Sequence, residues 1–321
     1  MKGIQHIEVS NRYAKYKFDL FRNITIIRGE SGTGKTTLYN MIADYTRDKE
    51  KSGVNLSSTA PCVALTDSDW KNQLGNIDDS IVFIDEDSKY ISSDEFANAV
   101  KNSSNYYVIF NRENLHNLPY SINEIYKIKT SGKHHSLVRV YNLSEKCELR
   151  SGKASPRFLP DVVLTEASHS GYQFFDAVVA KSKVKCVSSG SNSAVFSWLK
   201  SNADTNAVVI CDGAAFGAEI DRVTKLINGT RCVRLLLPES FEWMILKSGI
   251  IKNVDSVLAS PSNYIDSAEY FSWENFFTSY LIEKTKDSYL RYSKAKLNHA
   301  YLHDSEAKAI LDVLPDYIKP E

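Results

Sequence analysis

The sequence predicts an α/β fold with two domains and a helical tail. Two observations favour this class: short apolar segments alternate with segments of helical spacing in both halves, and a polar, turn-rich stretch separates the halves. At 321 residues, the chain is long enough for two hydrophobic cores. We therefore expect a first domain over 1–145, a linker over 146–160, a second domain over 161–265 and a C-terminal helical segment over 266–321.

The first half is expected to combine short strands with one longer helix. Its β-branched and apolar runs predict strands over 4–9, 13–18, 23–28, 62–65, 80–84 and 106–110. Apolar residues at helical spacing predict a helix over 35–46, and the polar stretch 47–58 is expected to be a surface loop. A closing hairpin is expected from 124–129 and 136–141, with Lys133, His134 and His135 at an exposed tip.

The second half repeats the α/β rhythm. Strands are expected over 161–165, 184–187, 207–211 and 233–237, alternating with helices over 171–180, 193–200, 214–227 and 240–246. This alternation predicts a parallel sheet with right-handed crossovers. The aromatic, amphipathic tail beyond residue 267 is expected to pack on the second domain; its glutamates argue against the alternative of a membrane-surface helix.

Composition and charge exclude several classes of protein. Lysine plus arginine and aspartate plus glutamate both number 39, so bulk charge gives no argument for nucleic-acid binding, although a local basic patch stays open. No apolar run is long enough to cross a bilayer, and the N-terminus lacks the apolar region of a signal peptide. The five cysteines form no C-x-x-C pair, which suits buried thiols in a reducing compartment. We expect a cytoplasmic protein without membrane association.

A phosphate-binding motif follows the third expected strand. Residues 29–36 match the pattern G-x-x-x-x-G-K-[ST], with a β-branched strand before them and a helical segment after them. Glycines let successive backbone N–H groups point at phosphate oxygens, and the helix N-terminus adds partial positive charge. The residues expected to bind the nucleotide are Gly29, Glu30, Ser31, Gly32, Thr33, Gly34, Lys35, Thr36 and Thr37.

The motif assigns chemical roles as well as a ligand. Lys35 is expected to reach the β- and γ-phosphates and to act in catalysis, and the hydroxyl of Thr36 is expected to coordinate Mg²⁺. The sequence therefore predicts ATP and Mg²⁺ as cofactors.

A second nucleotide-site element is expected at the end of the strand over 80–84. Four apolar residues precede Asp85 and Glu86, the pattern of a Walker B strand. Asp85 would hold Mg²⁺, and Glu86 would polarise the attacking water in hydrolysis. The alternative is a buried strand that ends in a solvated acidic turn. Asn111 or Arg112, at the end of the next strand, is a candidate sensor of the γ-phosphate.

The layout of residues 1–145 resembles ABC-type ATPases of the SMC, RecF and OLD group, on the strength of residues 29–36 and the Asp85–Glu86 pair. This sequence departs from the group because it has no L-S-G-G-Q-like signature and too short a segment between the two motifs for a helical arm. ABC heads pair by placing ATP between the P-loop of one protomer and the signature of the other. The resemblance implies a homo-oligomer, and the missing signature removes the usual reason for one.

Acidic residues end two of the strands expected in the second half. Glu166 follows the first of them and Asp212 follows the third. Carboxylates at the carboxyl ends of neighbouring parallel strands converge on one crevice and can hold Mg²⁺ through oxygen ligands. The sequence therefore predicts a metal site that includes Glu166 and Asp212. The alternative is a plain α/β domain in which these acids only cap the strand ends.

The order of these residues over 160–250 resembles the Toprim domain of topoisomerases, primases and OLD nucleases. In that family a glutamate works as acid and base and a D-x-D pair binds metal, which implies a catalytic role for Glu166 and a metal role for Asp212. Ala214 stands where the second aspartate belongs. The candidate substitutes for it are Glu219, Asp221, Glu239 and Glu242.

Together, the two resemblances imply an ATPase–Toprim fusion similar to OLD proteins of phage defence and mobile elements. ATP hydrolysis would control a second domain acting on nucleic acid. Two alternatives are an ATP-driven switch or sensor whose Toprim-like domain is catalytically dead and serves binding or assembly, and a small-molecule P-loop kinase. The sequence leaves open whether the nucleic acid is DNA or RNA, what the trigger is, and whether a partner protein of a defence system takes part.

Overall fold

The computed structural model describes residues 1–66, 69–149, 158–166, 169–180, 182–228 and 232–318. The chain forms two compact units. The first comprises Met1–Val140 and Ser260–Ser272, and the second comprises Tyr141–Ala259 and Trp273–Glu321. The first boundary lies slightly earlier than expected. In addition, Ser260–Ser272 packs with the first unit, although we expected it to end the second domain and begin the tail.

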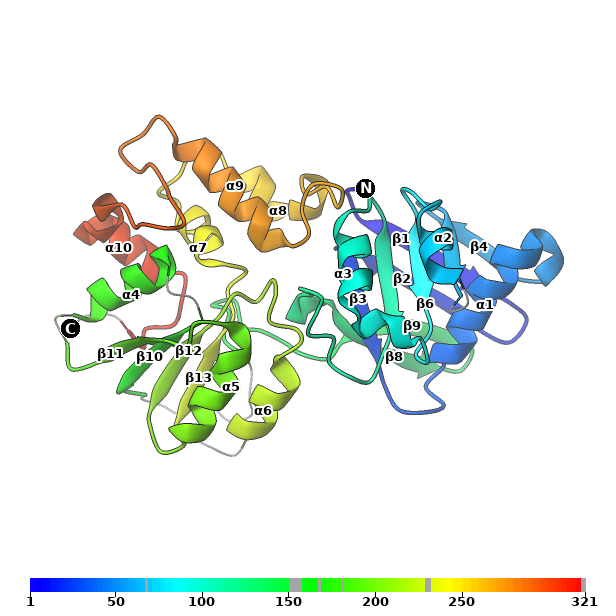
Figure 1. The fold of residues 1–321 in the computed structure, drawn as a ribbon, viewed down its shortest axis with the longest axis horizontal. Helices are drawn as coiled ribbons and strands as arrows, with labels where there is room; N and C mark the ends of the chain where they lie inside the picture. Colours follow the sequence, from blue (N-terminus) through cyan, green and yellow to red (C-terminus); the bar gives the residue numbers. More distant parts are fainter. Residues whose placement is uncertain (67–68, 150–157, 167–168, 181, 229–231, 319–321) are drawn as a thin grey trace. The chain divides into compact units, whose positions relative to one another are not determined.

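The described part of the first unit contains a nine-stranded sheet (Figure 1). Its strands are β1 (Gln5–Ser10), β2 (Lys15–Leu20), β3 (Ile24–Arg28), β4 (Asn55–Ser58), β5 (Cys62–Leu65), β6 (Ile81–Ile84), β7 (Tyr106–Phe110), β8 (Ile125–Ser131) and β9 (His134–Arg139), in the spatial order β4-β1-β2-β9-β8-β3-β7-β6-β5. The helices are α1 (Lys35–Asp48), α2 (Trp70–Leu74) and α3 (Asp94–Lys101), with 3₁₀ turns at Lys49–Ser52, Lys89–Ser92, Ile122–Glu124 and Pro261–Asn263.

The sheet joins a parallel half to a mostly antiparallel half. Strands β8, β3, β7, β6 and β5 run parallel in that order. The expected hairpins β1–β2 and β8–β9 are confirmed, and β2 pairs with β9 in parallel. The stretch 47–58 was wrongly expected to be only a loop, because Asn55–Ser58 pairs with β1. Its polar residues suit an edge strand, which hydrogen-bonds on one side only.

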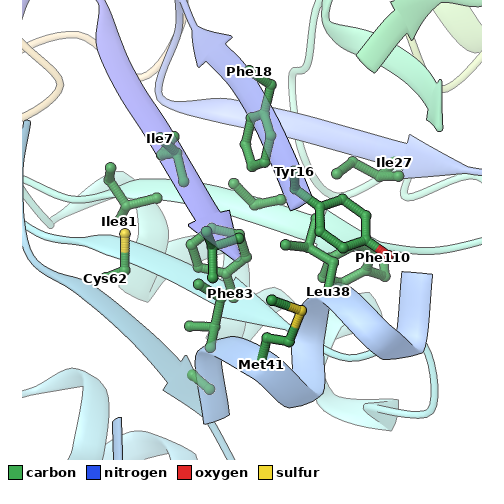
Figure 2. Packing of buried hydrophobic residues seen from close by; sticks show 14 of the residues in the cluster. Ile7, Tyr16, Phe18, Ile27, Leu38, Met41, Cys62, Ile81, Phe83 and Phe110 are labelled. Carbon is green, nitrogen blue, oxygen red and sulfur yellow. The ribbon is translucent and has the colours of Figure 1, made fainter. Parts of the chain in front are cut away.

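The core of the first unit lies between helix α1 and the sheet. Leu38 and Met41 of α1 point toward Ile7, Phe83 and Phe110 on the strands, and all five are buried (Figure 2). The spacing of the apolar residues in α1 makes one face of this helix apolar, and burial of that face fixes the helix on the sheet. This packing holds the N-terminus of α1 at the end of β3, where the glycine-rich loop lies.

The segment Ser260–Ser272 is tied to the first unit by hydrogen bonds to backbone groups and to the N-terminus. The N-terminal ammonium lies 3.0 Å from Asp266 Oδ1, the N–H of Gly3 donates to the carbonyl of Ser262 (2.6 Å), and the hydroxyl of Ser267 donates to the carbonyl of Ser104 (2.6 Å). The first unit contributes only backbone groups and the chain terminus to these bonds. No local pattern in the sequence therefore signals that this segment belongs to the first unit.

The described part of the second unit contains the expected parallel sheet. Its four strands are β10 (Val162–Thr165), β11 (Lys185–Ser188), β12 (Ala207–Ile210) and β13 (Val233–Leu236), in the order β11-β10-β12-β13, with every pair parallel. The helices are α4 (Ser170–Val179), α5 (Asn192–Ser201), α6 (Ile220–Ile227), α7 (Phe241–Lys247), α8 (Asp255–Ala259), α9 (Trp273–Thr285) and α10 (Asp304–Leu311), and a 3₁₀ turn spans His299–Leu302. The tail therefore contributes α9 and α10 to this unit, as expected.

The helix after β12 begins later than expected. Helix α6 starts at Ile220, and the residues just after β12 form turns instead. The N–H of Gly213 donates to the carbonyl of Pro238 (2.6 Å), and a Cβ at Gly213 would lie 2.7 Å from the carbonyl oxygen of Leu237. This close approach of two chain segments holds the residues after β12 out of a helix.

The start of the expected linker is part of the second unit. The N–H of Leu149 donates to the carbonyl of Leu235 (3.0 Å), and the N–H of Leu237 donates to the carbonyl of Cys147 (2.8 Å). Cys147 and Leu149 are both buried. These residues cover the outer edge of β13. The backbone groups of an uncovered edge strand would otherwise be open to pairing with another chain. The stretch 150–157 lies outside the described residues.

Candidate functional site

The glycine-rich loop connects the buried strand β3 to helix α1. Gly29, Gly32 and Gly34 have φ angles of +148°, +81° and +96°, which residues with a side chain rarely adopt. At Gly34 a Cβ would also lie 2.8 Å from the hydroxyl oxygen of Tyr16. Backbone conformation and close packing therefore both require glycine at the last position before Lys35.

Lys35 is held inside the loop that it ends. Its side chain is buried, and its ammonium group donates to the carbonyls of Gly29 and Glu30, the latter at 3.1 Å. The same Nζ lies 3.4 Å from Oε2 of Glu86. The two expected catalytic residues of the nucleotide site, 51 positions apart in the sequence, are thus brought together.

Strand order explains this convergence. Strand β6 ends directly before Asp85 and Glu86, and β7 lies between β3 and β6. The end of β7 carries Arg112, whose Nε contacts Oε1 of Glu86, so Glu86 lies between two cations. The backbone N–H of Glu86 also donates to Oδ1 of Asp85 (2.9 Å). The expected sensor residue Arg112 therefore touches the expected base directly.

These residues surround a cavity of about 400 Å³, a size typical of small-ligand sites. Its walls include Glu86, Arg112 and most of the expected nucleotide-binding residues, namely Glu30, Ser31, Gly32, Thr33, Gly34, Lys35, Thr36 and Thr37. Thr36 and Thr37 are exposed. The hydroxyl of Thr36 and the carboxylate of Asp85 are oxygen donors of the kind that Mg²⁺ prefers.

The remaining wall of the cavity was not anticipated. Tyr16 donates its hydroxyl to the carbonyl of Gly34 (2.9 Å), and its ring stacks on His135 with centroids 4.3 Å apart. His135, expected at an exposed tip, is half-buried; Thr130 Oγ1 lies 3.0 Å from its Nδ1. Burial lowers the pKa of His135, and the neighbouring His134 lowers it further. This wall depends on the pairing of β2 with β9, more than 110 residues apart, which no local pattern reveals.

The second unit brings Glu166 and Asp212 together, as their strand positions predict. Strands β10 and β12 are neighbours, and the backbone N–H of Asp212 donates to Oε2 of Glu166 (3.0 Å). A small cavity of about 50 Å³ lies beside them, and its walls also include Glu242 of α7 and Lys294 of the tail. Neither Lys294 nor any other tail residue was expected at this site.

Residues of the tail complete the bonding around these carboxylates. Tyr292 donates its hydroxyl to Oε1 of Glu242 (2.7 Å), and the hydroxyls of Tyr292 and Ser170 lie 2.6 Å apart. Lys294 donates to Oε1 of Glu274 (2.5 Å). The acidic cluster of the second unit is defined as Glu166, Asp212, Glu242 and Glu274. Its members Glu166, Glu242 and Glu274 therefore accept hydrogen bonds from within the chain.

Burial sets the protonation of the acidic cluster. It raises the pKa of Glu166 to about 8, and it raises the pKa of Asp212 well above its ordinary value. Glu242 and Glu274 add to both shifts, and the charge of Lys294 opposes them. Burial lowers the pKa of Lys294, but Glu274 and the other carboxylates outweigh it, so the net pKa is raised. Near neutral pH, Glu166 and Asp212 therefore retain a proton between them.

The acidic cluster does not have the form of a metal centre. Within the described ranges, no three side chains of His, Cys, Asp or Glu are grouped so that they could hold a metal ion. Ala214 is buried and supplies no ligand. Of the four acids weighed as substitutes, Glu242 lines the cavity and the half-buried Glu239 does not. Glu219 pairs with Arg222, and Asp221 accepts a hydrogen bond from Tyr141.

Comparison with known proteins adds no constraint on function. No protein-family model, curated protein or solved structure matches the chain. Among the described helices, none is both long and apolar enough to cross a membrane. The functional argument therefore depends on the geometry of the two sites.

Proposed function

We propose that the protein binds and hydrolyses ATP with Mg²⁺ in its first unit, and that the nucleotide state controls a second unit acting on nucleic acid. The 3.4 Å approach of Lys35 to Glu86, in a cavity lined by the glycine-rich loop, carries this proposal. A P-loop lysine beside a carboxylate at a neighbouring strand end suits transfer of a phosphoryl group to water.

The loop supports the binding of phosphates. Its backbone N–H groups and the N-terminus of α1 provide donors and partial positive charge. Lys35 would exchange the carbonyls of Gly29 and Glu30 for phosphate oxygens, a stronger charge-assisted interaction. Thr36 and Asp85 would hold Mg²⁺, which neutralises charge on the phosphates.

Glu86 is the residue best placed to take a proton from water. Without nucleotide, its two oxygens face Lys35 and Arg112. Phosphate oxygens would attract both cations and leave Glu86 free to accept a proton from water. The water oxygen would then attack the γ-phosphorus, and the bond between this phosphorus and the bridging oxygen would break. Arg112 is half-exposed and therefore has room to move toward the phosphate.

Action on nucleic acid is supported by the Toprim resemblance and by the approach of Glu166 to Asp212. A setting in phage defence or in a mobile element is part of the same proposal. The alternative, an ATP-driven switch whose second unit binds or assembles without cutting, is favoured by two observations. Ala214 supplies no metal ligand, and Glu242 and Glu274 of the acidic cluster already accept hydrogen bonds within the chain.

Steady-state phosphate release from ATP tests the first unit. Glu86→Gln is expected to bind ATP normally but to hydrolyse it about 10²–10⁴-fold more slowly, because it cannot accept the proton. Lys51→Ala, at an exposed lysine beyond α1, serves as the control and should behave as wild type. Wild-type turnover in Glu86→Gln would show that Glu86 is not the base. Transfer of phosphate to an acceptor molecule other than water would indicate a kinase instead.

Nicking of supercoiled plasmid, with and without ATP, tests the second unit. Metal-dependent nicking by the wild type that is lost in Glu166→Ala would support a nuclease. A preparation that hydrolyses ATP but does not nick would support the switch.

A further inference from the structure

We propose that Lys294 supplies from within the chain the positive charge that a metal ion would supply to a Toprim-like site, so that the acidic cluster is complete without metal. This inference concerns the second unit alone. It does not depend on ATP hydrolysis in the first unit, and either proposal can fail without the other.

The first argument is the position of Lys294. It shares the walls of one cavity with Glu166, Asp212 and Glu242, and its ammonium group donates to Glu274. An ammonium group has three donors and a compact charge, so it can serve several carboxylates at once.

The second argument is that the backbone around Lys294 is anchored. Its carbonyl accepts the N–H of Ser170 (3.0 Å). Gln173 of α4 donates to the carbonyl of Ala295 (3.1 Å) and accepts the N–H of Leu297 (2.8 Å). Helix α4 therefore holds the chain at Lys294 and just after it. Such bonds fix the backbone from which the half-exposed side chain of Lys294 extends toward the acidic cluster.

The third argument is the donor set that a metal would meet. Glu166 already accepts a backbone N–H, Glu242 accepts the hydroxyl of Tyr292, and Glu274 accepts Lys294. Ala214 offers no oxygen. Mg²⁺ requires near-octahedral oxygen coordination and retains several waters, whereas the cavity of about 50 Å³ has room for only a few. With Lys294 bonded to Glu274, the arrangement fits an ammonium group better than a hydrated divalent ion; loss of Lys294 would release Glu274 as an oxygen ligand.

The consequence is that removal of the lysine charge should create a demand for a metal. Lys294→Gln leaves the acidic cluster without its cation, a destabilising change that solvent moderates because the Lys294 side chain is 39% exposed. We expect its unfolding midpoint in EDTA to fall by about 2–4 °C. Mn²⁺ should restore part of this loss in Lys294→Gln and should leave the wild type unchanged.

The experiment is thermal unfolding of the full chain without nucleotide, in EDTA and in Mn²⁺. Lys294→Arg keeps the charge and should gain no response to Mn²⁺. Lys286→Gln, in the same tail but in an exposed pair with Glu283, should behave as wild type. A folded Lys294→Gln that ignores Mn²⁺ would overturn the proposal.

A direct measurement covers the case in which Lys294→Gln does not fold. Equilibrium binding of Mn²⁺ is compared between the wild type and Asp212→Asn, without nucleotide. We expect equal binding in the two proteins. Binding to the wild type that is lost in Asp212→Asn would show a working metal site at the acidic cluster and would refute the inference. ATP turnover in the same preparations reports on the first unit separately.

Discussion

The two units place a lysine among strand-end carboxylates in opposite ways. In the first unit, Lys35 and Glu86 border a cavity of about 400 Å³, and the threonines beside them are exposed. In the second unit, Lys294, Glu166, Asp212 and Glu242 border about 50 Å³. In each unit, parallel strands place carboxylates at one edge of the sheet. The volume of the cavity beside these charged residues decides whether they can bind a ligand or only pair with one another.

The comparison also concerns what each lysine can exchange. Lys35 lies 3.4 Å from Glu86, and its hydrogen bonds go to loop carbonyls that a phosphate can replace. Lys294 bonds to a carboxylate, and the chain around it is anchored to α4. A neutral carbonyl is a weaker partner for an ammonium group than an anion is. Lys35 can therefore exchange its carbonyl partners for a phosphate, whereas Lys294 already has an anionic partner within the chain.

The largest expected effect is on the exchangeable lysine. Lys35→Ala should reduce ATP turnover by about 10²–10³-fold, because it removes a charge aimed at the transferring phosphoryl group. Phosphate release measures this effect, and Lys51→Ala is again the control. Retained ATP turnover in Lys35→Ala would contradict this difference between the two lysines, since Lys35 would then have only a structural role, like Lys294.

The second prediction tests whether the first cavity depends on loop geometry. Gly34→Ala introduces a Cβ at a φ of +96° and 2.8 Å from the hydroxyl oxygen of Tyr16. ATP binding should weaken by at least about tenfold, since a left-handed conformation alone costs 1–2 kcal/mol. Adding Tyr16→Phe should relieve the steric part of the loss. Gly132→Ala, with a φ of +59° and open space around its Cβ, controls for backbone strain remote from the site.

The dissociation constant for ATP, measured by titrating each variant with ATP, checks this prediction. Equal weakening by Gly34→Ala and Gly132→Ala would point to general loss of stability rather than to loop geometry. No recovery in the double variant would assign the whole effect to the backbone.

The third prediction concerns the pH dependence of the second unit. The pKa of Glu166 is about 8 in the folded chain, above the ordinary 4.5, so the folded state binds the proton more tightly. The stability gained from this proton is complete below about pH 4.5 and is lost as the pH rises through 8, with a slope of at most about 1.4 kcal/mol per pH unit. The unfolding midpoint should therefore fall between pH 5 and pH 8, within the range set by these two pKa values.

Glu166→Gln provides the comparison for this pH profile. Its amide does not titrate, and Asp212 loses a neighbouring negative charge, so the midpoint should depend less on pH. Glu283→Gln, at an exposed carboxylate, should keep the wild-type profile. Parallel profiles for wild type and Glu166→Gln would mean that the acidic cluster does not hold the proton.

The parts of the two sites that the sequence predicts are those set by short segments. The glycine-rich loop, Lys35 and the strand ends at Glu86, Glu166 and Asp212 each follow from one strand and the residues after it. The α/β class and the parallel second sheet follow from the same local patterns.

The parts that the sequence does not predict depend on distant pairing. His135 reaches the first cavity because β9 pairs with β2, and Lys294 reaches the acidic cluster because the tail packs on α4. Ser260–Ser272 joins the first unit through bonds to its backbone groups and to the N-terminus, one of which is made by the side chain of Asp266. A lone histidine or lysine has no local signature of such a role, since much of its environment comes from residues distant in the sequence.

The smallest expected effect tests the wall that the sequence did not reveal. Tyr16→Phe removes one hydrogen bond to the carbonyl of Gly34 but keeps the ring that stacks on His135. The bond is worth about 1 kcal/mol, so KM for ATP should rise about fivefold while kcat changes little. A fall in kcat with KM unchanged would instead mean that Tyr16 acts in the chemical step. Tyr13→Phe, at an exposed tyrosine of the same hairpin, should change neither constant. The result would show whether the first site owes its shape to the loop alone or also to the β2–β9 pairing beside it.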